Sequence, residues 1–314
     1  MKNLKCGLSL GIIMCLAFFT SCQKEAGTTS KGSLPTVVID SITNITSNSS
    51  TVHSNATSDG GSAITARGVC WKTSSNPTIS DSKTSDGTAT GIFTSSITGL
   101  NANTTYYVKA YATNSVGTTY GTEVSFKTPL ASVKISTQEW TLKNLDVATY
   151  RNGDIIPQVT DSAQWANLTT GAWCYYNNDP ANAVIYGKLY NWYAVNDPRG
   201  LAPQGWHIPT KDEWSTLTAF LGSDSLAGGK MKATTLWNSP NTGATNSSGF
   251  TAVPGGARVS DARFMSIGAV GYWWSDKEHD ATTAVERGLK FDNSACYMFY
   301  ITKGCGISVR CVKD

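Results

Sequence analysis

The side chains that could bind a metal or act as nucleophiles are mainly the eight cysteines and three histidines of the chain. The histidines, His53, His207 and His279, lie far apart, and neither an H-E-x-x-H motif nor a C-x-x-C pair occurs. A zinc site needs such closely spaced nitrogen and sulfur ligands. We therefore expect no metal site, no cofactor and no catalytic residue, and the chain is not expected to be an enzyme.

Cys22 stands at the end of a short apolar stretch near the start of the chain. Two lysines precede this stretch, Leu8–Phe19, which is too short to span a membrane. The order Thr20-Ser21-Cys22 resembles the lipobox of bacterial lipoproteins. The resemblance implies that residues 1–22 are a lipoprotein signal peptide, that Cys22 carries lipid, and that the exported protein is anchored to the outer membrane. An ordinary signal peptide with a coincidental cysteine is the alternative.

Residues 23–35 are polar and rich in turn-forming residues, so we expect a flexible tether. Its first residues, Gln23-Lys24-Glu25, resemble the surface-export signals that lipoproteins of Bacteroidota carry after the cysteine. That likeness implies exposure on the cell surface, and a simple soluble linker is the alternative.

The cysteines beyond Cys22 predict disulfide bonds in an exported protein. Four of them, Cys174, Cys296, Cys305 and Cys311, lie in the second half of the chain, and Cys70 stands alone upstream. We expect two disulfides among the four, with Cys70 free and buried. A hairpin over 297–302 would join Cys296 to Cys305 and leave Cys174 for Cys311, but three pairings remain open. The alternative is that all five are reduced and buried.

The composition excludes bulk attraction to nucleic acid, because the net charge is only +3 and 15% of residues are charged. Glycine, serine, threonine and asparagine are abundant, which is typical of an exported β-rich protein with many turns.

Residues 36–129 alternate short β-rich runs with turns, and we expect strands over 36–42, 66–72, 91–97, 106–113 and 123–128. The pattern from Leu100 through Tyr106 to Asn114 resembles the second half of a fibronectin type III domain. The resemblance implies an all-β sandwich in which Leu100 and Tyr106 form a tyrosine corner. Such a module acts as a spacer.

Residues 133–314 are enough for a second domain with its own core. We expect one helix over about 186–195 and another after Thr210, where Thr210 and Glu213 form a capping box and Gly222 ends the helix. A weaker helix is expected over 225–233. Trp273 and Trp274 are adjacent on a strand, so one should face the core and the other outward or into a layer of loops. Arg310 is expected to satisfy buried carbonyl groups or a carboxylate.

A series of motifs follows along 133–314: Trp140-x-x-x-Asn144-Leu145-Asp146, Tyr150-x-Asn152-Gly153-Asp154, Cys174-Tyr175-Tyr176-Asn177-Asn178, Tyr186-Gly187-x-Leu189-Tyr190-Asn191-Trp192, Gly205-Trp206-His207-Ile208-Pro209, Gly249-Phe250-x-Ala252-x-Pro254-Gly255-Gly256, Tyr272-Trp273-Trp274-Ser275 and Ser308-Val309-Arg310-Cys311. With these motifs the segment resembles the Fibrobacter succinogenes major paralogous domain. The resemblance implies an α+β C-type lectin-like fold, similar to that of formylglycine-generating enzymes.

Proteins of that fold present ligands with residues near their C-terminal strands, which here means Ser275–Tyr300. The candidate ligand-binding residues combine charge with aromatic rings: Lys277, Glu278, His279, Asp280, Arg287, Tyr297, Phe299 and Tyr300. Ordinary loop charges and core aromatics are the alternative for the whole set. The Pro-containing motifs of calcium-dependent lectins do not occur, although Asn196-Asp197 could offer oxygen ligands.

We expect a non-catalytic cell-surface lipoprotein whose lectin-like head binds a glycan or a host or bacterial surface protein. One alternative is a structural component of a surface layer or fimbria-like assembly. A second is a copper oxidase of the formylglycine-generating type, which would use Cys305 and Cys311, although their spacing departs from the enzyme pattern.

Overall fold

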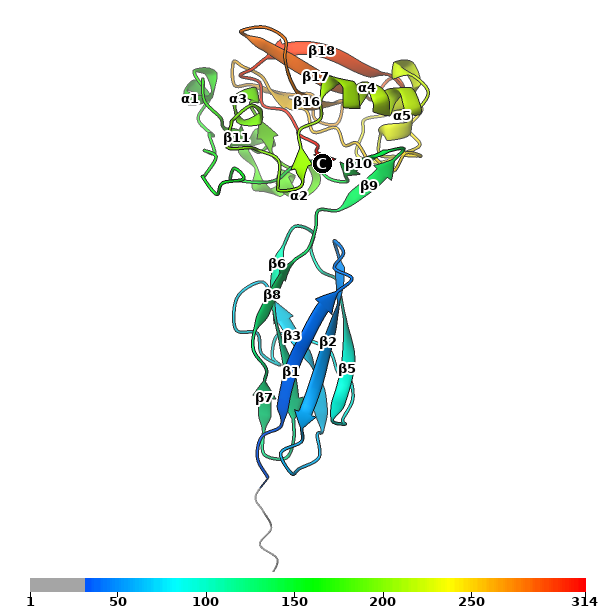
Figure 1. The fold of residues 1–314 in the computed structure, drawn as a ribbon. Helices are drawn as coiled ribbons and strands as arrows, with labels where there is room; N and C mark the ends of the chain where they lie inside the picture. The colour runs from blue at the N-terminus through cyan, green and yellow to red at the C-terminus, as the bar shows by residue number, and fades with distance from the viewer. Residues whose placement is uncertain (1–31) are drawn as a thin grey trace, which may run out of the picture.

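The computed structural model of the chain describes residues 32–314. The expected signal peptide, Cys22 and residues 23–31 of the expected tether lie outside the described residues. None of the helices within 32–314 is long and apolar enough to cross a membrane. Figure 1 shows an elongated β-sandwich followed by a rounder head of short strands, loops and helices.

The N-terminal part is an antiparallel β-sandwich, as the sequence predicts. One sheet has the strand order β1-β2-β5, and the other has β4-β3-β6-β7 with β8 also paired to β6. The strands are β1 (Thr36–Thr43), β2 (Ser49–Ser58), β3 (Ala66–Lys72), β4 (Ser82–Lys83), β5 (Gly91–Thr98), β6 (Thr105–Thr113), β7 (Thr118–Tyr120) and β8 (Val124–Lys127). Side chains along β6 alternate between buried and exposed positions. The buried ones pack with buried side chains of the other sheet in one shared core.

The tyrosine corner is confirmed. The backbone N–H of Asn101 donates to the hydroxyl of Tyr106 over 2.9 Å, and both Tyr106 and Leu100 are buried. Strand β2 was not expected, because its inward positions include Ser50 and Ser54 and the segment lacks an apolar pattern.

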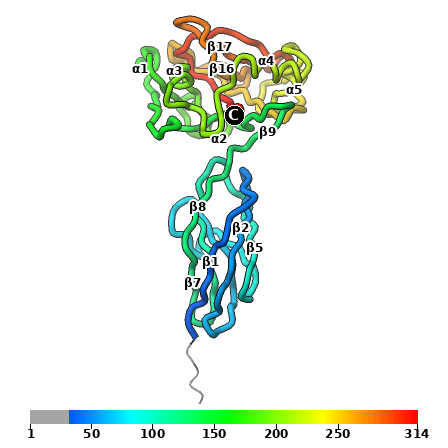
Figure 2. Tube along the Cα trace, viewed as in Figure 1, coloured from blue at the N-terminus to red at the C-terminus, as the bar shows by residue number. Residues whose placement is uncertain are grey.

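The head contains many short strands and few helices. Its strands are β9 (Ser132–Ile135), β10 (Gln138–Thr141), β11 (Trp173–Cys174), β12 (Leu189–Tyr190), β13 (Trp206–His207), β14 (Ala257–Arg258), β15 (Phe264–Met265), β16 (Val270–Glu278), β17 (Thr283–Lys290), β18 (Cys296–Thr302) and β19 (Val312–Lys313). Its α-helices are α1 (Ser162–Ala166), α2 (Ala183–Tyr186), α3 (Trp192–Val195), α4 (Lys211–Phe220) and α5 (Asp224–Met231), with 3-10 turns η1 (Tyr176–Asn178) and η2 (Pro180–Asn182). Strand β19 pairs with β10, so the C-terminus returns close to where the head begins (Figure 2).

The helix expected over 186–195 is interrupted. Helix α2 ends where Gly187 adopts φ 70°, the chain then extends into β12, and Asn191 caps the new helix α3 through its side chain. The helix after Thr210 is confirmed as α4 with both hydrogen bonds of the capping box, and the weaker helix is α5.

Two clusters of buried side chains form the main cores of the head, and they lie on opposite faces of β16. Trp273 belongs to one cluster and Trp274 to the other, and both are fully buried. Of the two alternatives for the second tryptophan, the outward one is wrong, because the sheet is covered on both sides at this point and Trp274 packs within the second cluster.

Arg310 has the structural role that the sequence predicts. Its fully buried guanidinium donates to the carbonyl oxygens of Thr141, Phe250 and Thr251 and to the side-chain oxygen of Asn144. The last residues of the chain are thereby tied to β10 and to the loop around Phe250.

The expected disulfides are not formed, and Cys174, Cys296, Cys305 and Cys311 are all free and buried, as is Cys70. Cys174 and Cys296 each lie in a different cluster of buried side chains from that of Cys305 and Cys311. The hairpin expected over 297–302 is instead the straight strand β18, which pairs with β17 along its whole length. Cys296 begins this strand and Cys305 follows its other end, so the two are about 20 Å apart, too far for an S–S bond.

Candidate functional site

The candidate residues gather on the tip sheet, the three-stranded antiparallel sheet β16-β17-β18. Figure 1 shows this sheet at the end of the head that is farthest from the sandwich. Lys277 and Glu278 end β16, His279 and Asp280 begin the following turn, and the aromatic residues lie on β18. Strand β18 forms one edge of the sheet.

Arg287 does not belong to the exposed set. It lies opposite Trp273 and Met298 in the sheet, so its side chain points toward the helices and is only 2% exposed. Its guanidinium contacts the carboxylate of Asp224 (3.3 Å) and the hydroxyl of Ser215 (3.0 Å). Arg287 thus fastens the tip sheet to α4 and α5, and its expected role as an exposed ligand-binding residue is wrong.

Phe299 and Tyr300 are the exposed aromatic residues of β18, with relative exposures of 43% and 46%. Because they are consecutive in a strand, their rings project to opposite faces. The ring of His279 stacks on Tyr300 with centroids 3.7 Å apart and planes inclined by 13°. The ring of Phe299 stacks on Tyr297 at 5.6 Å. Each face of the edge strand therefore carries a pair of stacked rings.

The carboxylates of the two acidic candidates, Glu278 and Asp280, already bind neighbouring groups of the protein. The carboxylate of Glu278 pairs with the ammonium of Lys303, which also donates to the carbonyl of Ala281. The carboxylate of Asp280 accepts hydrogen bonds from the backbone N–H groups of Thr282 and Thr283 and from the hydroxyl of Thr282, and these bonds hold its pKa well below the usual range. Lys277, His279, Tyr297, Phe299 and Tyr300 remain as the contact residues of the tip sheet.

Glu286 is a feature that the sequence reasoning missed. It lies between Trp274 and Phe299 in the sheet, it is fully buried, and neither carboxylate oxygen has a hydrogen-bond partner within the described residues. Burial raises its pKa to about 8, against the opposing charges of Arg287 and Lys290. The signal was the pair Glu286-Arg287 inside the run Ala284–Leu289, whose other residues are apolar or glycine, which marks charges placed in a core strand.

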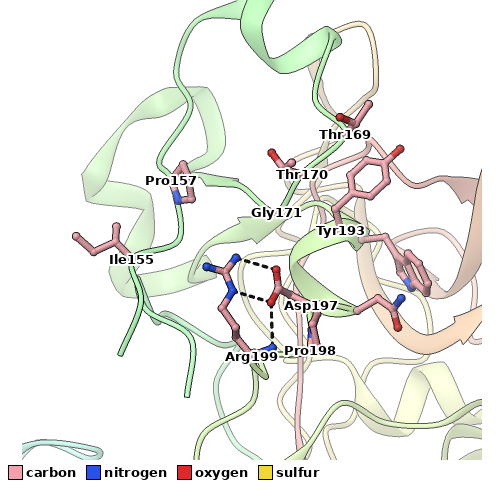
Figure 3. Close-up of a pocket in the computed structure, with 11 residues that line it drawn as sticks. Ile155, Pro157, Thr169, Thr170, Gly171, Tyr193, Asp197, Pro198 and Arg199 are labelled. Atoms are coloured by element: carbon pink, nitrogen blue, oxygen red, sulfur yellow. Dashed lines mark hydrogen bonds and ion pairs between the residues drawn. The ribbon is translucent and has the colours of Figure 1, made fainter. Parts of the chain in front are cut away.

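A cleft of about 490 Å³ opens on another part of the head, between α3 and the loops around Pro157 and Thr169 (Figure 3). Its walls offer the hydroxyl groups of Thr169 and Thr170 and the ring of Tyr193. Asp197 also lines it, but its carboxylate accepts two hydrogen bonds from the guanidinium of Arg199 over 2.9 Å each. These bonds lower the pKa of Asp197, and they occupy the oxygens that the sequence suggested for a cation.

A family model matches residues 133–313, under the description Fibrobacter succinogenes major domain. The chain belongs to this family. The major domain, as we call the matched residues, includes the tip sheet, the cleft and every cysteine of the head. None of the curated proteins matches the sequence.

Solved structures similar to parts of the chain include two β-rich domains. The sensor domain of the anti-sigma factor RsgI4 of Pseudobacteroides cellulosolvens is 20% identical, and the match covers 31% of this chain and 96% of that one with a TM-score of 0.24. The sixth fibronectin type III domain of human fibronectin type III domain containing protein 3 is 23% identical, and the match covers 34% of this chain and 97% of that one with a TM-score of 0.26.

The thiols that a copper oxidase would need are deeply placed in the major domain. Burial raises the pKa of Cys311 to about 12 and also raises that of Cys305. Copper binds thiolates rather than thiols, so burial opposes metal binding by this pair. Within residues 32–314, no group of three histidine, cysteine or carboxylate side chains is arranged to hold a metal ion.

Proposed function

We propose that the major domain is a non-catalytic, C-type lectin-like binding head that holds a glycan or protein ligand with the edge of its tip sheet. The observation that carries this proposal is the exposure of Phe299 and Tyr300 on the edge strand β18. Large aromatic side chains contribute much of the energy of recognition, because they bury a wide, rigid surface at low entropic cost.

The stacked pairs on the two faces of β18 favour a ligand that contacts both faces of this edge strand. His279 holds the ring of Tyr300 on one face, and Tyr297 holds the ring of Phe299 on the other. A ring that is already fixed loses little freedom when a ligand packs against it. Such rings suit the apolar face of a sugar or an apolar side chain of a protein.

The position of the tip sheet also supports a binding role. It lies at the end of the head away from the sandwich, and the sandwich separates the head from the N-terminal end (Figure 1). We propose that Cys22 anchors the chain by lipid to the outer membrane, with the head displayed outside the cell. The sandwich then acts as a spacer that presents the tip sheet to glycans or proteins of another surface.

The test is an array of glycans, host-matrix proteins and bacterial surface proteins probed with the chain from Gln23 onward. We expect binding by the wild type, loss of binding in the double variant Tyr297→Ala, Tyr300→Ala, and retention in Phe220→Ala. Phe220 is a matched control, because it is a 59% exposed aromatic residue on α4. Absence of binding, or binding that survives the double variant, would refute the proposal.

A further inference from the structure

We propose that the free edge of β18 pairs with the same edge of a second copy of this chain, so that two heads join tip to tip as one continuous antiparallel sheet. Such a dimer goes beyond ligand binding and needs no outside ligand. It would make the protein a component of a surface assembly as well as a binding head.

The hydrogen-bond pattern of the tip sheet leaves one edge of β18 open. The backbone N–H of Lys303 donates to the carbonyl of Thr282 over 2.9 Å, and the pairing of β17 with β18 continues from there without a shift. In an antiparallel ladder, alternate residues bond to the neighbouring strand. Phe299 and Ile301 therefore bond to β17, whereas Met298 and Tyr300 direct their N–H and C=O groups outward. No other strand of residues 32–314 pairs with that edge.

This edge lacks the features that normally prevent strands from adding. Natural edge strands are protected by lysine, proline or a bulge. Here β4 carries Lys83, β9 carries Lys134, and β1 has two register shifts. Residues 297–301 read Tyr-Met-Phe-Tyr-Ile, with no charge, no proline and no bulge.

A second copy fits this edge in charge and in hydrogen bonding. Residues 298–302 carry no charged side chain, so two copies meet across a two-fold axis without like-charge repulsion. With Tyr300 opposite Tyr300 of the second copy, Met298 lies opposite Thr302. The carbonyl oxygen of Thr302 already accepts a hydrogen bond from the backbone N–H of Cys305 over 3.0 Å, so the central pairing is between the two copies of Tyr300. The side chain of the adjacent Lys303 is already paired with Glu278.

Helix α5 limits how far the two strands can overlap. The backbone of Gly228 packs so closely on the edge strand that an added Cβ would lie 2.4 Å from the carbonyl oxygen of Ala295. The pairing is therefore restricted to 298–302, and this short overlap predicts a weak, reversible dimer. The tip sheet lies at the far end of the head, so two elongated molecules can meet there end to end (Figure 2).

The test is sedimentation velocity of the chain from Gln23 over a wide concentration range, with amide hydrogen exchange read at β18. We expect a dimer that grows with concentration and slows exchange at Met298 and Tyr300, while Phe299 is protected in monomer and dimer alike. Tyr300→Lys places two ammonium groups opposite each other and should weaken the dimer about tenfold or more. Tyr300→Phe is the matched control and should dimerise like the wild type.

Met298→Pro is a second variant that acts on the main chain. It removes an outward N–H group while leaving the bonds between β17 and β18 intact, so it should also weaken the dimer. A monomer at every concentration would overturn the proposal, as would a dimer that tolerates Tyr300→Lys and leaves exchange at β18 unchanged. A ligand and a second copy would use the same edge, so the two results are read separately. A dimer without binding on the array overturns only the binding role, and binding by a chain that stays monomeric overturns only the dimer.

Discussion

Replacing Glu286 with glutamine should change how the stability of the protein depends on pH. The wild-type carboxyl group is fully buried without a partner, and its pKa is about 8 in the folded protein against 4.5 for an ordinary glutamate. Glutamine has nearly the same shape and does not titrate. The Glu286→Gln variant therefore isolates the free energy of keeping this carboxyl protonated.

The sign follows from the protons bound in each state. Below pH 4.5 the glutamate is protonated in both states and adds no dependence on pH. Between pH 4.5 and about 8 only the unfolded state releases the proton, so the free energy of unfolding falls by about 1.4 kcal/mol per pH unit. The total loss approaches roughly 4–5 kcal/mol by pH 8, and it levels off at higher pH as the folded state also ionises.

Urea unfolding of both proteins between pH 4 and pH 9 measures this effect. We expect the stability advantage of Glu286→Gln over the wild type to grow by several kcal/mol between pH 4.5 and pH 8. Glu139→Gln is the control. Hydrogen bonds from Ser132 and Lys313 lower the pKa of Glu139, so removing this carboxylate should cost stability as the pH rises rather than add it. An advantage that stays constant with pH would show that Glu286 is paired or solvated in the fold, and would refute the reasoning.

Four further predictions concern the framework of the fold. Arg310→Met leaves several buried carbonyl groups without donors and should reduce the free energy of unfolding by about 3–5 kcal/mol, measured by urea titration; a loss below 1 kcal/mol would contradict its role. Thr210→Ala removes the N-cap of α4 and should lower the free energy of unfolding by about 1 kcal/mol in the same assay. Thr216→Ala is the control, because it makes the same substitution inside α4, away from the cap. Tyr106→Phe removes the hydroxyl of the tyrosine corner and should cost about 0.5–1.5 kcal/mol. Added dithiothreitol should leave Tm unchanged because every described cysteine is free, and a fall of several degrees would reveal a disulfide.

Local chemistry made part of this fold predictable from the sequence. The capping box of Thr210 and Glu213 fixed the start of α4, because both hydrogen bonds form within four residues. The resemblance to a fibronectin type III domain implied the tyrosine corner, whose hydrogen bond joins two residues that are close in the sequence, Asn101 and Tyr106. Arg310 could be assigned a structural role because a guanidinium in an apolar, motif-rich segment needs several acceptors.

Features that depend on distant packing were not predictable. Strand β2 turns small hydroxyl side chains inward, so its sequence gives no apolar alternation. The burial of Arg287 depends on Asp224 and Ser215 of helices far away in the sequence. The cysteines suggested disulfides because their number and spacing do not reveal that Cys174 and Cys296 each lie in a cluster of their own, away from that of Cys305 and Cys311.

The candidate residues were named from the sequence, but their arrangement was not. The sequence reasoning proposed the stretch Ser275–Tyr300, and the stacked pairs of β18 come from residues that it named. The open edge of β18 and the buried Glu286 follow from strand register, which no pattern in 270–302 specifies.

The most direct test of the proposed binding role is the affinity of the tip sheet for the strongest ligand found on the array. Titration calorimetry should give at least a tenfold higher Kd for Tyr300→Ala than for the wild type, which corresponds to about 1.4 kcal/mol. Ile155→Ala, at the cleft, should bind like the wild type. Equal affinities for wild type and Tyr300→Ala, with a loss in Ile155→Ala, would place binding in the cleft and contradict a site on β18.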